Sequence, residues 1–427
     1  MVRSALPAFV LLLLPGTAAP LALAGDGFGA RATGGVGGAS VSASSAGDLS
    51  TYATSALPYV ITVSGTITLT GNVPIASNKT IQGADSNATI VGNLYIGSGV
   101  SNVIIRCLDI TNPAGVGDGD GITVINGAKN VLITHCTFTD CADGELDITN
   151  HSDSVTVSWC RFRYVTQAAH RNLNLIGSSD AATTDLGYLH VTVHHCWFDQ
   201  LSSERMPSVR FGRVHVYSNY YSAAGNSYCV RTRLYAECLV EGNCFENVQN
   251  PWELLTTTGT TGKLRAVNNN VSYLDTSFGV TWVSGWYAGQ SLVPGTDSVF
   301  LPPYPYVLTS LEVLKDTVMR YAGNTGQDIA LAVAGASGPV GGFSLSQNYP
   351  NPFNSETTIS FDLPEAAFVS LTVVDLLGRE VARIVSETLE GGRHRRQWDA
   401  ARVGSGVYLC RLQAGTLHAT GRVIVLK

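Results

Sequence analysis

The sequence is poor in charge, in membrane-length apolar runs and in metal-binding cysteine motifs. Asp, Glu, Lys and Arg make up 14% of its 427 residues, whereas an average soluble protein has about 25%. Beyond the first 24 residues, no apolar segment is long enough to cross a bilayer. None of the nine cysteines has the spacing of a zinc site. These absences argue against a membrane bundle and a zinc-stabilised fold. The low charge and 45 glycines suit a chain that buries an apolar stack and turns often.

A β-rich pattern recurs along the middle of the chain, in residues 130–136, 154–160, 190–196 and 213–219. Aligning these runs gives one reference position, which is occupied by Cys136, Cys160, Cys196 and Asn219 and continued by Asn243. The spacings of 24, 36, 23 and 24 residues indicate a solenoid with one coil per repeat. The runs alternate and are rich in Val, Ile and Thr. We therefore expect an all-β parallel β-helix, with a loop inserted in the longest coil.

The cysteines allow two interpretations. The cysteines at or near the reference position are expected to be buried thiols that stack on one another. Cys229, Cys238 and Cys244 lie close together in sequence and could instead form a disulfide, but the sequence does not define the connectivity.

Charged residues stand at similar offsets before the reference position of their own coil: 16 residues for Asp120, 17 for Asp143, 13 for Asp147 and 14 for Arg205. Similar offsets in successive coils place side chains on the same face, with neighbouring strands about 4.8 Å apart. Alternation along a strand further suggests that Asp143, Glu145 and Asp147 share a side. The pattern predicts an acidic pocket next to a basic one.

The ends of the chain differ from this body. Residues 1–24 have the features of a secretory signal peptide, with a membrane anchor as the alternative. Residues 25–323 are expected to form the β-helix, with a helix at 309–323, and residues 324–342 a linker. Short strands in 343–427 predict a small C-terminal β-sandwich. The C-terminal unit carries nine Lys and Arg and eight Asp and Glu, which leaves the rest at a net charge of −7. Nucleic acid is therefore not an expected partner.

An ordered set of motifs resembles the pectate lyase family, over about residues 55–323; the motifs are 102–106, 118–122, 143–148, 154–159, 175–180, 191–195 and 205–219. The resemblance implies a right-handed parallel β-helix and a Ca²⁺-dependent enzyme that cleaves polygalacturonate (pectate) by β-elimination. Residues 346–354, 376–381, 398–399 and 405–408 resemble the C-terminal sorting module of bacterial type IX secretion. This second resemblance implies the secretion machinery as a partner and a secreted or cell-surface location.

The pectate lyase resemblance also assigns roles to residues. It implies that Asp120, Asp143 and Asp147 bind Ca²⁺, with Asp118 as an auxiliary ligand. Hard carboxylate oxygens suit this ion. Arg205 matches the catalytic base of the family, and a second arginine, Arg210, matches the group that binds the substrate carboxylate.

Two positions depart from the family pattern. A basic residue usually found five positions before the glycine of Leu-Ile-Gly is Asn172 here, and the adjacent Arg171 is the candidate to replace it in substrate binding. The family's Trp-Ile-Asp-His becomes residues 132–135, Leu-Ile-Thr-His, which lacks the carboxylate.

Arg205 as a base predicts an alkaline pH optimum, because a guanidinium is almost always protonated near pH 7. Two other functions remain open: a metal-independent hydrolase of the polygalacturonase kind, and a non-catalytic β-helix that binds polysaccharide or acts as a surface adhesin. A lyase acting on methyl-esterified pectin is less favoured, because it would not need the aspartate cluster. We expect a monomer.

Overall fold

The computed structural model describes residues 27–168, 170–255, 262–275, 280–283, 286–287, 290–291, 295–325, 344–345, 348, 353–363, 365–375, 379–401, 403–415 and 417–426. The expected signal peptide, residues 1–24, and all but the first two residues of the expected linker lie outside these ranges. The chain divides into two compact units, Met1–Ile329 and Ala330–Lys427. Each unit is described by itself.

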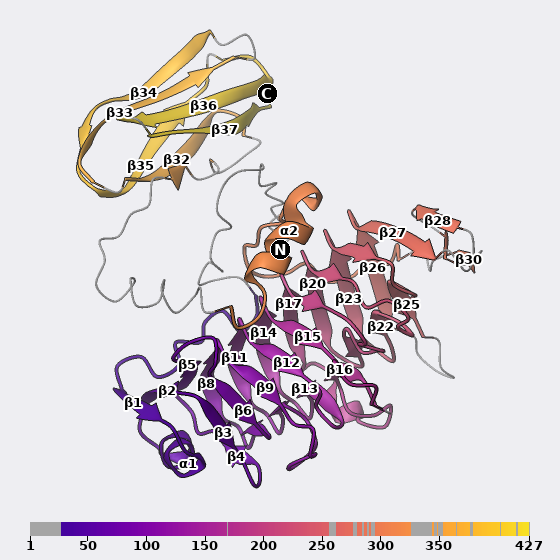
Figure 1. Cartoon of the computed structure of the whole chain (residues 1–427). Helices are drawn as coiled ribbons and strands as arrows, with labels where there is room; N and C mark the ends of the chain where they lie inside the picture. Colours follow the sequence, from indigo (N-terminus) through magenta and orange to yellow (C-terminus); the bar gives the residue numbers. More distant parts are fainter. Residues whose placement is uncertain are drawn as a thin grey trace. The chain divides into compact units, whose positions relative to one another are not determined.

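The first unit is a solenoid in which three parallel sheets run along its length (Figure 1). Sheet A contains β1 (Ala39–Ala43), β2 (Tyr59–Val63), β5 (Lys79–Gly83), β8 (Ser101–Arg106), β11 (Lys129–Thr134), β14 (Asp153–Ser158), β17 (His190–His194), β20 (Arg213–Tyr217), β23 (Glu237–Glu241) and β26 (Lys263–Val267). Sheet B contains β3 (Thr66–Thr68), β6 (Thr89–Val91), β9 (Asp109–Thr111), β12 (Thr137–Thr139), β15 (Arg161–Arg163), β18 (Trp197–Phe198), β21 (Tyr220–Tyr221), β24 (Cys244–Glu246), β27 (Asn270–Asp275) and an antiparallel last strand, β28 (Val280–Val283). Sheet C contains β4 (Val73–Pro74), β7 (Leu94–Ile96), β10 (Ile122–Val124), β13 (Gly144–Ile148), β16 (Asn172–Ile176), β19 (Ser208–Val209), β22 (Val230–Thr232) and β25 (Trp252–Leu254).

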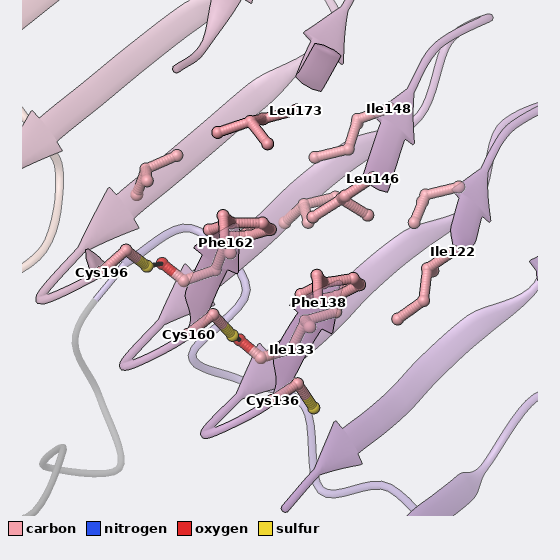
Figure 2. Packing of buried hydrophobic residues seen from close by; sticks show 14 of the residues in the cluster. Ile122, Ile133, Cys136, Phe138, Leu146, Ile148, Cys160, Phe162, Leu173 and Cys196 are labelled. Atoms are coloured by element: carbon pink, nitrogen blue, oxygen red, sulfur yellow. Dashed lines mark hydrogen bonds between the residues drawn. The ribbon is translucent and has the colours of Figure 1, made fainter. Parts of the chain in front are cut away.

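The expected register of the coils is confirmed. In sheet A, Val131 lies opposite Val155, which lies opposite Val191 and then Val214. The reference position forms an internal ladder, and Figure 2 shows its cysteines stacked beside layers of Phe and Ile side chains. At its later end the backbone N–H of Cys196 donates to the Asn219 amide oxygen at 2.8 Å.

All nine cysteines are buried free thiols, so the buried-thiol interpretation is confirmed and the suggested pairing among Cys229, Cys238 and Cys244 does not occur. The ladder instead continues through asparagines. Asn219 donates to the Asn243 side-chain oxygen, and Asn243 in turn donates to Asn269. These amides satisfy one another in an interior where an unpaired polar group would be costly.

Among its described residues, the first unit also has two helices and a short 3-10 turn. Helix α1 (Ala46–Thr54) begins at Ser45, whose side chain accepts the Asp48 N–H, and it buries Leu49 and Ala53 in the solenoid core. Helix α2 (Leu311–Tyr321) lies within the expected range of 309–323 and follows Ser310, whose side chain makes no capping hydrogen bond. The 3-10 turn η1 (Thr183–Asp185) lies in the long loop of the largest coil, and β29 (Trp286–Tyr287) pairs with β30 (Gln290–Ser291). Neither described helix has the length and apolarity of a membrane span.

The outer side of sheet A is covered by chain segments from both ends of the unit. The N–H of Gly29 donates to Thr156 Oγ1, and Phe28 packs on His190 and Tyr304. Helix α2 packs on sheet B, where Leu314 and Val318 meet Tyr220 and Cys244.

A buried histidine that directly follows a strand of sheet A contacts Thr309, in the segment that precedes α2. His195 Nε2 lies 2.8 Å from Thr309 Oγ1, and its Nδ1 lies 2.8 Å from His194 Nδ1. The ring stacks on Trp159 at a centroid distance of 4.3 Å. Burial lowers the pKa of His195 from 6.5 to about 3, so the folded protein keeps this ring neutral.

His195 is expected to make the stability of the solenoid depend on pH. Its folded pKa lies below its unfolded value, so its contribution is complete above pH 6.5 and is lost as the pH falls toward 3. One pH unit corresponds to about 1.4 kcal/mol. The cost of His195→Gln should therefore shrink by about 2 kcal/mol between pH 7 and pH 5, as measured by urea unfolding of both proteins. A cost that does not change with pH would contradict this assignment.

The second unit consists of two antiparallel sheets that share one core. One contains β31 (Ser344–Leu345), β32 (Glu356–Leu363) and β35 (Gly392–Asp399); the other contains β34 (Glu380–Leu389), β33 (Ala367–Val374), β36 (Gly406–Ala414) and β37 (Leu417–Val425). Apolar side chains from both sheets form the core, including Phe361, Leu371 and Trp398. The expected small β-sandwich is therefore present.

Candidate active site

The predicted acidic residues lie at the start of two neighbouring strands of sheet C. Asp120 comes just before β10, Asp143 immediately precedes β13, and Asp147 lies within β13. In the register of these strands Thr123 pairs with Asp147, which brings Asp120 level with Gly144. Asp118 and Asp143 are exposed, whereas Asp120 is buried. The solenoid register thus gathers four carboxylates around the starts of β10 and β13 in sheet C.

Gly144 separates two of these carboxylates. Its backbone N–H donates to Asp120 Oδ1 at 2.9 Å. A Cβ atom at position 144 would lie 2.9 Å from Asp120 Oδ1 and 2.9 Å from Asp147 Oδ1. Thr123 Oγ1 donates to the other oxygen, Asp120 Oδ2. Glycine therefore lets the two carboxylates approach the same point, and Thr123 fixes the orientation of Asp120.

Burial, together with the charges of neighbouring carboxylates, raises the pKa values of Asp120 and Asp147. Burial and the charge of Asp147 raise the pKa of Asp120 from 3.8 to about 8. Burial likewise raises the pKa of Asp147 to about 7, with Arg205 acting in the opposite direction and Asp143 and Asp118 adding to the rise. Asp147 is therefore within electrostatic reach of Asp120, Asp143, Asp118 and Arg205.

Arg205 lies just before β19 in sheet C, two coils after the one that holds Asp143 and Asp147. Its backbone carbonyl accepts the N–H of Asn174 in β16 at 2.7 Å, and the preceding Glu204 bridges to Asn172. Arg205 is partly exposed and has a positive φ of 64°. The guanidinium charge acts on Asp147. Arg205 is thus on the same face as the aspartates, as the offsets predict.

Arg210 is more enclosed. Its side chain is 11% exposed, its Nε donates to Asp180 Oδ1 at 2.5 Å and its Nη1 donates to the Gly177 carbonyl at 3.0 Å. Burial lowers the pKa of Arg210, while Asp180 opposes the shift. The same Asp180 carboxylate also accepts from Arg233 Nη2 at 3.1 Å.

The two adjacent candidates for a basic residue have different surroundings. Asn172 is buried at the start of β16, in register with Gly144, and so occupies the strand position next to the acidic group. Arg171 is partly exposed, and its Nη1 donates to the Leu201 carbonyl at 2.9 Å. The second departure from the family pattern lies elsewhere, because Thr134 is in sheet A and hydrogen-bonds to Ser158 and His135.

Glu145 does not follow the expected alternation. It is fully buried, and its carboxylate interacts with Asp140 and Arg163 rather than with Asp143 or Asp147. The sequence reasoning also missed Asp180 and Arg233. Register could have found Arg233, because Val209 pairs with Thr232 and so Arg233 stands one coil beyond Arg210.

Whether the acidic group suits a metal ion depends on its oxygen atoms. Among the residues that the structure describes, no three His, Cys, Asp or Glu side chains are arranged to hold a metal ion by themselves. However, Asp147 Oδ1 is buried and has no hydrogen-bond partner in this part of the chain. Repelling, buried carboxylates with an unpaired oxygen fit a hard divalent cation that takes further oxygen ligands from water or a bound molecule.

Comparison with known proteins identifies two families in the chain. Residues 2–327 match the family model described as pectate lyase, and residues 347–426 match the one described as a secretion system C-terminal sorting domain. A pectate trisaccharide-lyase of Thermotoga maritima is 38% identical over 200 residues, which are 44% of this chain and 52% of that protein. A probable pectate lyase A of Aspergillus flavus is 33% identical over 276 residues, which are 62% of this chain and 76% of that protein. The match thus spans about half the length of the first of these relatives.

Solved structures show the same fold. A pectate lyase from Bacillus sp. N165 in complex with trigalacturonate superposes with a TM-score of 0.59 and 25% identity, over 70% of this chain and 99% of that one. The cedar pollen allergen jun a 1 superposes with a TM-score of 0.57 and 22% identity, over 70% of this chain and 92% of that one, which shows the fold alone. The family model spans the whole described solenoid. The chain belongs to the pectate lyase family and carries a C-terminal sorting domain.

Proposed function

We propose that the protein is an exported, Ca²⁺-dependent pectate lyase that cleaves polygalacturonate by β-elimination. The observation that carries the proposal is the meeting of four aspartates and Arg205 on sheet C of a chain in this family. The sorting domain supports export, with the secretion machinery as a partner and a secreted or cell-surface location.

The acidic group would bind the cation. Asp120, Asp143 and Asp147 would supply the carboxylate oxygens, and Asp118 would add negative charge at the exposed side. A bound Ca²⁺ would neutralise the carboxylate of a galacturonate unit and so make its carbon-5 hydrogen more acidic.

Arg205 would remove the carbon-5 proton. The Arg205 side chain can accept a proton only in its neutral guanidine form, so the rate should be highest in alkaline solution. The electron pair of the broken C–H bond forms the carbon–carbon double bond as the bond from carbon 4 to the glycosidic oxygen breaks, and that oxygen takes a proton from water. Arg210 would bind the uronate carboxylate and stabilise the negative charge that develops on it. The products are a shortened chain and an oligosaccharide with an unsaturated uronate end.

The reaction distinguishes this proposal from its rivals. The purified full chain is incubated with polygalacturonate in alkaline buffer containing Ca²⁺, or EDTA in its place. We expect ultraviolet-absorbing unsaturated products with Ca²⁺, none with EDTA, and recovery when excess Ca²⁺ is restored. New reducing ends without ultraviolet absorbance, unaffected by EDTA, would indicate a hydrolase. Binding without any product would indicate a non-catalytic polysaccharide-binding protein.

A further inference from the structure

Asp180 connects two arginines that project from successive coils of sheet C. It lies in the long loop between β16 and β17, and its carboxylate meets Arg210 Nε at 2.5 Å and Arg233 Nη2 at 3.1 and 3.2 Å. The Asp180 side chain is 42% exposed, whereas those of Arg210 and Arg233 are 11% and 19% exposed. The loop therefore delivers a carboxylate to two largely enclosed cations.

Two contacts on different sides of the Arg210 guanidinium fix its plane. Nε–H points to Asp180 and one Nη1–H points to the Gly177 carbonyl. A guanidinium has five N–H donors in one plane. In the described part of the chain, Nη2 of Arg210 donates to no protein group, so this end of the planar fork remains available to an incoming anion.

Gly177, at the start of the loop, allows the backbone to lie close to Arg210. Gly177 has a positive φ of 82°, and a Cβ atom there would lie 2.8 Å from the Arg210 carbonyl oxygen and 2.9 Å from the Arg210 Cβ. No side chain fits in that space. The glycine thus allows the start of the loop to lie directly against Arg210, with its carbonyl as the second acceptor.

Arg233 also holds the Asp180 carboxylate, through both of its oxygen atoms. Without a carboxylate between them, the two guanidinium groups would repel each other. The positive charge of Arg233 helps to lower the pKa of Arg210. Asp180 offsets this repulsion by accepting from both. The geometry leaves Arg210 with a fixed plane and a free donor edge.

We propose that Asp180 is a positioning residue that acts through Arg210: it orients the guanidinium so that its free Nη2 edge binds a uronate carboxylate. The inference rests on the proposed function, in which Arg210 binds that carboxylate. Asp180 does not itself touch the substrate. Its removal should therefore matter only while Arg210 is present.

A double-mutant cycle tests this coupling. Binding of trigalacturonate in the presence of Ca²⁺ is measured by calorimetry for the full chain and for Asp180→Asn, Arg210→Gln and the double variant. We expect Asp180→Asn alone to weaken binding about tenfold, and the double variant to bind no more weakly than Arg210→Gln alone. Asp185→Asn is the matched control in the same loop, because its Oδ1 accepts the His151 N–H and an amide oxygen can do the same. The control should bind within about twofold of the parent.

The outcomes separate this inference from the proposed function. If the two single losses multiply in the double variant, or if Asp180→Asn binds as tightly as the parent, the positioning role is overturned. Asp180→Glu should recover part of the lost affinity, which a general loss of folding would not allow. A parent that binds trigalacturonate with the expected coupling but forms no unsaturated product would contradict the lyase activity and leave the role of Asp180 intact.

Discussion

Arg205→Ala is expected to lower kcat on polygalacturonate by about 10³-fold, within the range that a general base contributes. The side chain reaches the acidic group from a separate coil, and its charge acts on Asp147. In the proposed reaction no other group takes the carbon-5 proton. Binding of trigalacturonate should change much less than kcat, because Arg210 and the cation still hold the carboxylate. Initial rates followed by ultraviolet absorbance measure the effect.

A matched arginine shows whether the loss is specific. Arg213 begins β20 in sheet A, its side chain is 54% exposed, and its Nε lies 3.9 Å from Glu237. Arg213→Ala should retain the parent rate, since an exposed ion pair contributes little. Arg205→Ala must also unfold at the parent temperature for the comparison to count. A well-folded Arg205→Ala protein that kept its turnover would exclude Arg205 as the base.

Asp147→Asn is expected to raise the Ca²⁺ concentration needed for half-maximal activity by about 100-fold or more, because the charge and number of ligands set the affinity of such sites. Asp147 Oδ1 is buried, unpaired among the described residues, and adjacent to Asp120. Asparagine keeps the shape of the side chain and removes its negative charge. Asp316→Asn, on the exposed side of α2, is the control and should need no more Ca²⁺ than the parent.

Asp147→Asn, which should weaken Ca²⁺ binding, should make the folded protein more stable when no Ca²⁺ is present. The pKa of Asp147 is raised to about 7, so its charged form destabilises the folded state above that pH when no cation is bound. In EDTA at pH 8, Asp147→Asn should therefore unfold at a higher temperature than the parent. Saturating Ca²⁺ should reverse the order, because only the parent binds the ion tightly. A variant that is less stable than the parent in EDTA would show that Asp147 serves the fold rather than the cation.

The sequence predicts the solenoid well because its information is local and repeated. A buried reference position recurs in each coil, so the offsets of Asp120, Asp143, Asp147 and Arg205 translate directly into a shared face. In the paired row of sheet C, Thr123 and Asp147 both stand 13 residues before their reference residue and Ser208 stands 11 before Asn219, whereas Leu175, in the coil with the inserted loop, stands 21 before Cys196. The aspartates and Arg205 belong to coils without that insertion, so their offsets place them together.

The details that the sequence does not predict depend on departures from that regularity. Simple alternation puts Glu145 on the side of Asp143 and Asp147, but Asp143 precedes the strand, and Glu145 is buried near Tyr164. The partner of Arg210 comes from the inserted loop, whose path is set by Gly177 and by contacts across 30 residues of sequence. Offsets within a repeat do not describe an insertion, so Asp180 could be found only from the structure.

The most direct test is a crystal structure of the Arg205→Ala protein grown with Ca²⁺ and trigalacturonate. The account predicts a cation bound by Asp147 together with Asp120 or Asp143, bridged to a sugar carboxylate that also meets Arg210. Carbon-5 of that sugar should face the space left by the missing guanidinium. A trisaccharide bound along sheet A or sheet B, or a cation bound away from these aspartates, would contradict the account.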